Sequence, residues 1–136
     1  MKKWVLILFS LAAFVFLFSA CSPEKGIVLF NKEPITSKNA LKDSKNFESG
    51  SRVYYLFVAP QRMKDDFIRV QVFKMTDKAP WGGNEVVRTK DYRLRKDEKY
   101  YHTNYFTLHE KGRYVMQVFS MDDFQHPLAV DFFYVK

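Results

Sequence analysis

The sequence predicts an all-β fold, an antiparallel sandwich of seven or eight short strands. Turn signals recur about every 8–12 residues, and no segment has the apolar spacing of an amphipathic helix. The clearest strand covers residues 67–75, where Ile68, Val70 and Val72 alternate with polar residues. One buried and one wetted face is typical of an antiparallel sheet. A small barrel is the main alternative.

The first half of the domain contains two expected strands separated by a long polar connection. Residues 26–30 form a short apolar strand, and residues 51–59 form one rich in β-branched and aromatic residues. We expect one weak strand near Ile35 within the connection, residues 31–50. Two apolar side chains are expected to anchor this connection on the core: Leu41 and Phe47.

The second half contains the remaining strands. Residues 80–83, Pro-Trp-Gly-Gly, are a strong loop signal. Two strands of modest quality are expected around residues 86–87 and 92–94, and residues 99–108 form a strand dense in aromatic residues. Residues 128–135 form the last strand, which we expect to lie inside a sheet.

The segment from Phe106 to Phe119 predicts a corner between two strands. One strand ends at Leu108, and the turn before the next contains Gly112, which supplies conformational freedom. Tyr114 follows two residues later, where its hydroxyl can return to upstream backbone. This resembles the tyrosine corner of immunoglobulin-like sandwiches. The resemblance implies an immunoglobulin-like domain of the bacterial extracellular kind, without the Cys…Trp…Cys core of antibodies.

The N-terminus has the parts of an export signal. Two lysines precede an apolar run from Trp4 to Phe18, and Ser19-Ala20-Cys21 follows. A single-pass membrane helix is the alternative, although the run is short for one. Phe18-Ser19-Ala20-Cys21 resembles the lipobox of bacterial lipoproteins, departing from it at Phe18, where most lipoboxes carry leucine.

This resemblance implies a division of the chain into three parts. Residues 1–20 are a signal peptide, residues 21–25 a lipidated cysteine with a short tether, and residues 26–136 the sandwich domain. Acyl chains on Cys21 would anchor the protein in a membrane. Ser22 is not the aspartate that retains enteric lipoproteins at the inner membrane, so the resemblance implies an outer-membrane location in the cell envelope.

The mature chain of 116 residues would carry a formal charge of +5. An exported protein rarely meets nucleic acid, so we expect none as a partner. Anionic lipids, an acidic glycan or a protein partner are more plausible, and scattered lysines that keep the surface soluble are the alternative. With Cys21, the only cysteine, committed to lipid, no disulfide or thiolate nucleophile is expected.

The titratable residues do not predict an enzyme. The serines have no recognisable base nearby, and no phosphate-binding or dinucleotide motif occurs. The histidines lack the spacing of a zinc motif and are expected to be solvated or capping, and the paired aspartates fall in turns. We therefore expect no catalysis, cofactor or metal from His102, His109, His126, Asp65-Asp66 or Asp122-Asp123.

A basic and aromatic segment, residues 88–105, is the predicted recognition surface. Alternation places Tyr100 and His102 inward with Phe106. The ligand-binding candidates are Arg88, Arg93, Arg95, Lys96, Lys99 and the outward Tyr101 and Tyr105. Tyrosines beside basic residues are typical of recognition surfaces. Packing of these tyrosines against a neighbouring strand or loop is the alternative.

Two functional hypotheses follow. The first is a membrane-anchored lipoprotein that acts as a non-catalytic binding or adhesion module for protein or glycan. The second is a structural or accessory subunit of an envelope assembly, held by strand edges or faces.

Overall fold

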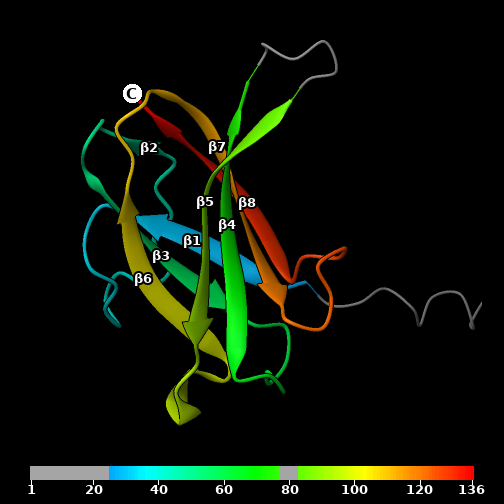
Figure 1. The fold of residues 1–136 in the computed structure, drawn as a ribbon. Coiled ribbons are helices and arrows are strands. Elements are labelled where there is room, and N and C mark those ends of the chain that lie inside the picture. The colour runs from blue at the N-terminus through cyan, green and yellow to red at the C-terminus, as the bar shows by residue number, and fades with distance from the viewer. Residues whose placement is uncertain (1–24, 77–82) are drawn as a thin grey trace, which may run out of the picture.

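The computed structural model describes residues 25–76 and 83–136, which fold into two β-sheets packed face to face (Figure 1). The elements in chain order are β1 (Ile27–Asn31), β2 (Asn46–Phe47), β3 (Arg52–Val58), β4 (Phe67–Met75), β5 (Asn84–Arg93), the 3-10 turn η1 (Lys96–Glu98), β6 (Tyr101–Thr107), β7 (Gly112–Ser120) and β8 (Ala129–Val135). The sheets have the orders β1-β3-β6 and β2-β8-β7-β4-β5. The predicted sandwich is therefore confirmed over the barrel.

The sheets are almost entirely antiparallel, as the sequence predicts. All neighbours are antiparallel except β2 and β8, which are parallel. The last strand, β8, lies between β2 and β7, so the prediction that it is inside a sheet is confirmed.

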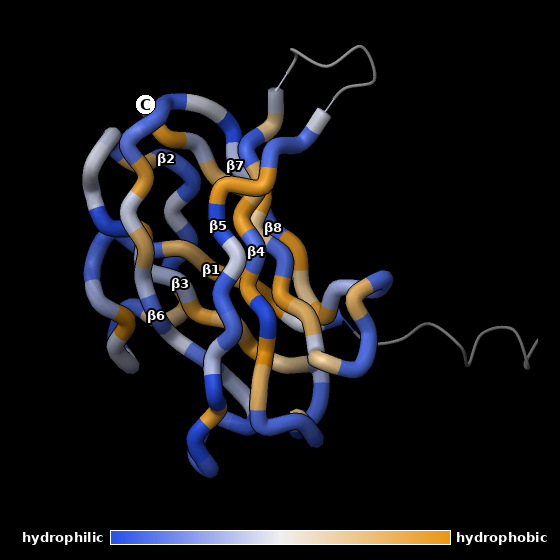
Figure 2. The backbone as a smooth tube through the Cα atoms, viewed as in Figure 1, coloured by the Kyte–Doolittle hydropathy of each residue, from blue (hydrophilic) through white to orange (hydrophobic). Residues whose placement is uncertain are grey.

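The core lies between the sheets and is built by alternation along the strands. Ile68, Val70 and Val72 of β4 are buried in it, as predicted. Figure 2 shows the corresponding changes between hydrophobic and hydrophilic residues along β4. Tyr55 and Phe133, from opposite sheets, are both 0 % exposed. Burial of an apolar side chain such as that of Phe133 contributes about 1.5–3 kcal/mol to folding.

Only one of the two apolar anchors predicted for the connection between β1 and β2 is present. Phe47 is buried on the core, as predicted, but Leu41 is 90 % exposed, and no strand forms near Ile35. The connection is held instead by Asn39, which is 7 % exposed. Its side chain accepts a hydrogen bond from the Thr36 N–H (2.7 Å) and donates one to the Pro34 carbonyl (2.9 Å). Polar bonds to backbone replace the expected apolar anchor.

The two modest strands predicted around residues 86–87 and 92–94 are one strand, β5. Its residues are mostly exposed, and it forms one edge of the five-stranded sheet. Pairing with β4 along its length supports it despite weak alternation, and the register shifts once, between Val72 and Phe73. Most of the predicted Pro80–Gly83 loop lies outside the described residues, as do residues 1–20 and Cys21.

The predicted tyrosine corner joins the two sheets. The Tyr114 hydroxyl donates a hydrogen bond to the Glu110 carbonyl oxygen (2.5 Å), and its ring stacks on Phe133 at 5.5 Å between centroids. Gly112 has φ +155°, and a Cβ there would lie 2.8 Å from Lys74 Cε. The bond and the positive φ are therefore those that the sequence predicts for a corner between β6 and β7.

Candidate ligand-binding groove

The predicted outward tyrosines lie on the outer face of the three-stranded sheet. Tyr101 and Tyr105 are 45 % and 44 % exposed on β6. Tyr100 was expected inward, but it is 58 % exposed. The strand begins at Tyr101, so its alternation does not extend to the residue before it.

Lys99 is not part of an exposed surface, and its prediction as a ligand residue is wrong. Its side chain is buried, and its ammonium donates to the Asp65 carbonyl and the Asp66 carboxylate, both at 2.8 Å. The hydrogen bond from Lys99 holds the pKa of the Asp66 carboxyl below its ordinary value. Lys99 therefore ties the β3–β4 loop to the segment after η1, because a buried ammonium needs partners.

The other basic candidates do not gather around the tyrosines. The Arg88 guanidinium lies 6.0 Å from the Phe106 ring centroid, at the open side between β5 and β6. Arg95 donates to the Glu98 carboxylate at 2.7 Å. Arg93 and Lys96 are exposed at the end of β5 and in η1. The predicted basic and aromatic surface is therefore divided between two sheets and a loop.

Two residues of β3 that are not among the predicted ligand residues lie beside Tyr105. Tyr54 is its cross-strand partner, with ring centroids 5.5 Å apart, and the Arg52 guanidinium lies 4.7 Å from the Tyr105 centroid. Alternation along residues 51–59 could have placed both outward. The pairing of β3 with β6 is not a local property of the sequence, so their meeting with Tyr105 could not be predicted.

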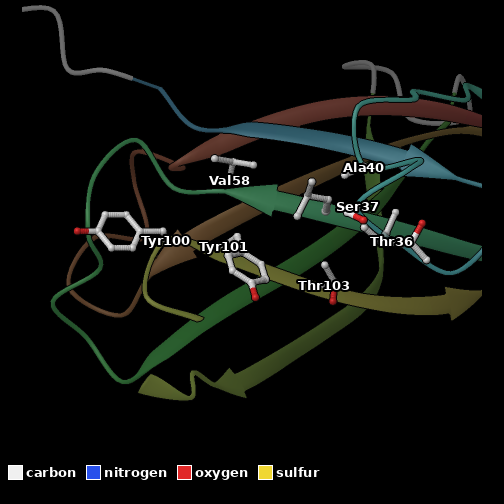
Figure 3. Close-up of a pocket in the computed structure, with 9 residues that line it drawn as sticks. Thr36, Ser37, Ala40, Val58, Tyr100, Tyr101 and Thr103 are labelled. Carbon is white, nitrogen blue, oxygen red and sulfur yellow. The ribbon is translucent and has the colours of Figure 1, made fainter. Parts of the chain in front are cut away.

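A groove of about 580 Å³ lies on this outer face, between the β1–β2 connection and strands β3 and β6 (Figure 3). Leu56 shows how closely the connection covers the sheet, because it is 8 % exposed although it belongs to the outward register of β3. The groove is lined by Ile35, Thr36, Ser37, Ala40, Leu56, Val58, Tyr100, Tyr101 and Thr103.

The groove lining has a consistent chemistry. Apolar side chains form part of the wall, and threonine, serine and tyrosine contribute hydroxyl groups. None of the nine lining side chains carries a charge at neutral pH. Such a surface can pack against apolar faces of a ligand and exchange hydrogen bonds with its polar groups. Its volume is within the usual range for small-ligand sites.

The histidines differ from the expectation that all are solvated or capping. His102 is 4 % exposed, because it lies on the inward face of β6 with Phe106, as the alternation of this strand predicts. Burial lowers the pKa of His102. The Glu98 carboxylate, which lies 2.9 Å from Nδ1, acts in the opposite direction but does not outweigh burial. His126 is exposed and lies 3.0 Å from Asp123. Within residues 25–76 and 83–136, no three His, Cys, Asp or Glu side chains converge as a metal site would require.

The structure is similar to that of an immunoglobulin-like protein from Pseudomonas aeruginosa. The TM-score is 0.51 at 14 % sequence identity, covering 85 % of this chain and 99 % of that one. At this identity the similarity shows the fold alone. This domain has an immunoglobulin-like fold, as the sequence predicts.

A weaker similarity extends to the Pseudomonas fluorescens alkylpurine DNA glycosylase bound to DNA containing an abasic site analogue. Its TM-score is 0.41 at 13 % identity, over 80 % of this chain and 30 % of the glycosylase, too low to support an argument. No protein-family model matches the sequence, and no curated protein matches it. In the part of the chain that the structure describes, no helix is long and apolar enough to span a membrane.

Proposed function

We propose that the protein is a lipid-anchored lipoprotein of the cell envelope whose immunoglobulin-like domain is a non-catalytic binding or adhesion module. The observation that supports binding is the groove between the β1–β2 connection and the outer face of β3 and β6. The Phe18-Ser19-Ala20-Cys21 motif supports the anchor, with acylation of Cys21.

The groove lining favours an uncharged ligand. The sequence alone predicts basic residues beside the tyrosines, a pattern that favours an acidic partner. Lys99 is buried and Arg95 is paired with Glu98, while the groove itself is neutral. A neutral glycan or an uncharged stretch of protein suits hydroxyl groups and tyrosine rings better.

Photocrosslinking in intact cells tests the binding function. A photoreactive phenylalanine analogue at Tyr101 lies in the groove, and the same analogue at Tyr134 lies on β8, which belongs to the other sheet. The two tyrosines are 45 % and 37 % exposed, which makes them matched probes. We expect adducts with an envelope protein or glycan from position 101 only. Equal adducts at both positions, or none at 101, would contradict the groove as the binding site.

A structural role in an envelope assembly is the second candidate, and the edge of β6 favours it. This seven-residue strand ends its sheet and contains no Lys, Arg, Asp or Glu. The Asn104 side chain accepts a hydrogen bond from the Tyr105 N–H (2.8 Å), which covers one edge donor. An uncharged edge can pair with a strand of another chain. Concentration-dependent association of the purified protein with envelope partners would favour this role.

A further inference from the structure

The chain enters the domain at one end of the sandwich. The Gly26 N–H donates to the Leu128 carbonyl oxygen at 2.7 Å, which holds the entry point against the start of β8. The strand register brings the ends of other strands to the same place, because Ile27 pairs with Val58 and Val58 pairs with Tyr101. We call this part of the molecule the tether-proximal end: residues 25–27, 58–67, 93–101 and 121–130 (Figure 1).

Exposed apolar side chains concentrate at this end. It contains under a third of the described residues but seven of the thirteen exposed large hydrophobic ones. These seven are Ile27, Val58, Phe67, Tyr100, Tyr101, Phe124 and Val130. Ile27, Val58 and Tyr101 lie on the outer face of the three-stranded sheet, and Phe67 and Val130 lie on that of the five-stranded sheet. Scattered exposed hydrophobic residues need no explanation, but a concentration at one end of a domain indicates a contact with something apolar.

The chemistry of this end suits the surface of a bilayer. Four of the seven exposed side chains are aromatic, and aromatic rings are enriched at the membrane interface. The end carries seven Lys or Arg side chains and six Asp or Glu side chains, so it has almost no net charge. Attraction to anionic headgroups therefore contributes little, and insertion of aromatic and apolar groups is the main source of binding.

The length of the tether limits where a membrane can be. From Cys21 to Lys25 are four residues, which span about 13–14 Å when fully extended. A bilayer that holds acyl chains on Cys21 therefore lies close to the tether-proximal end. Tyr134, by contrast, is an exposed residue near the opposite end of β8, where it pairs with Arg113.

We propose that the tether-proximal end rests on the membrane, with Phe124, Phe67 and Tyr100 contacting the lipid interface. This proposal rests on the lipid anchor of the proposed function. It adds that the domain is held in one orientation by its own surface, and does not tumble freely on the tether. The groove then opens beside the bilayer, since Tyr100 and Tyr101 belong to both regions.

Tryptophan quenching by brominated lipids tests the orientation in the full-length protein. In a Trp81→Phe background, Phe124→Trp places a probe at the tether-proximal end, and Tyr134→Trp places the control at an exposed position near the opposite end of β8. The native Trp4 leaves with the signal peptide if cleavage precedes Cys21. The acylated protein is placed in nanodiscs with and without brominated lipid, and Tyr100→Trp is a second probe in case Phe124→Trp disturbs its loop.

We expect quenching at residues 124 and 100 to be at least about fivefold greater than at residue 134, with little change between zwitterionic and anionic lipids. Similar quenching at all three positions, or none at 124 and 100, overturns the proposal while leaving the anchor intact. Mass spectrometry of the same samples reports the anchor separately. An unmodified Cys21 would overturn the anchor, and this orientation with it.

Discussion

The two outer faces of the sandwich differ in the side chains that they expose to solvent. The five-stranded sheet pairs its charges: Arg69 binds the Asp91 carboxylate at 2.8 and 3.0 Å, and Lys45 lies 2.5 Å from Asp131. The three-stranded sheet instead presents tyrosines and a neutral groove, partly covered by the β1–β2 connection. Charged side chains that bind one another leave few groups for a ligand. The groove on the three-stranded sheet has an uncharged lining, which keeps its apolar and hydroxyl groups available.

The largest expected effect is a loss of ligand affinity, which distinguishes the groove face from the face of the five-stranded sheet. Tyr101→Ala removes a ring from the groove, whereas Tyr134→Ala removes a similarly exposed ring from the five-stranded sheet. Once crosslinking has identified the ligand, we expect Tyr101→Ala to weaken binding about 10–100-fold, the range for a central aromatic contact. Tyr134→Ala should bind normally in the same titration. A larger loss of affinity in Tyr134→Ala would show that the ligand binds to the five-stranded sheet.

A second change tests the corner that joins the sheets. Gly112→Val should lower the free energy of unfolding by about 1–3 kcal/mol, because valine strains a backbone at φ +155° and its Cβ meets Lys74. Denaturant unfolding measures the loss. Gly50→Val is an informative companion, since Gly50 has φ +80° but its Cβ would meet only the exposed His109 ring at 3.3 Å. Wild-type stability for Gly112→Val would show that the corner tolerates a branched residue.

Tyr114→Phe is a milder test of the same corner. It deletes the hydroxyl that binds the Glu110 carbonyl but keeps the ring stacked on Phe133. We expect a loss of about 0.5–1.5 kcal/mol with the fold intact, which is typical of one hydrogen bond. Thermal and chemical unfolding should agree on this value. An unchanged stability would leave the ring as a core residue and remove the hydroxyl from the account of the corner.

A smaller effect on the free energy of unfolding is expected from a change of pH, because β6 of the three-stranded sheet buries His102. Burial lowers the pKa of His102, so the unfolded chain, with an ordinary pKa of about 6.5, takes up the proton first as the pH falls. The contribution to stability is complete above about pH 6.5 and decreases below it. Burial tends to raise the pKa of Glu98, but hydrogen bonds from Arg95 and His102 hold it below its ordinary value, so its contribution is lost at still lower pH.

Unfolding measured between pH 8 and 5 checks this dependence. In the His102→Gln variant, the free energy of unfolding should vary less with pH in that interval, because the group that takes up the proton is gone. The carboxylates contribute mainly at lower pH. An identical slope in the variant would assign the acid sensitivity to other groups.

Local patterns explain which features were predictable. The corner depends on Gly112 and Tyr114, which are two residues apart, and the burial of Ile68, Val70 and Val72 follows from a period of two. The groove depends on the meeting of Ile35 with β3 and β6, which no local pattern specifies. The burial of Lys99 could not be predicted locally. A lysine is normally expected at the surface, and the partners of Lys99, Asp65 and Asp66, are more than thirty residues away in the chain.

The smallest expected effect concerns the basic residues that the sequence selected. Arg93→Gln and Lys96→Gln remove two exposed charges of the predicted surface, and neither residue lines the groove. Exposed charges are screened over about 8–10 Å in physiological salt, so a neutral ligand in the groove should not respond to them. We therefore expect the double variant to bind as the wild type does, with an affinity that is insensitive to salt. The acidic partner and its basic site would be supported instead if the variant bound more weakly and if high salt weakened binding of the wild type. The Tyr101→Ala variant measured in the same series distinguishes that site from the groove.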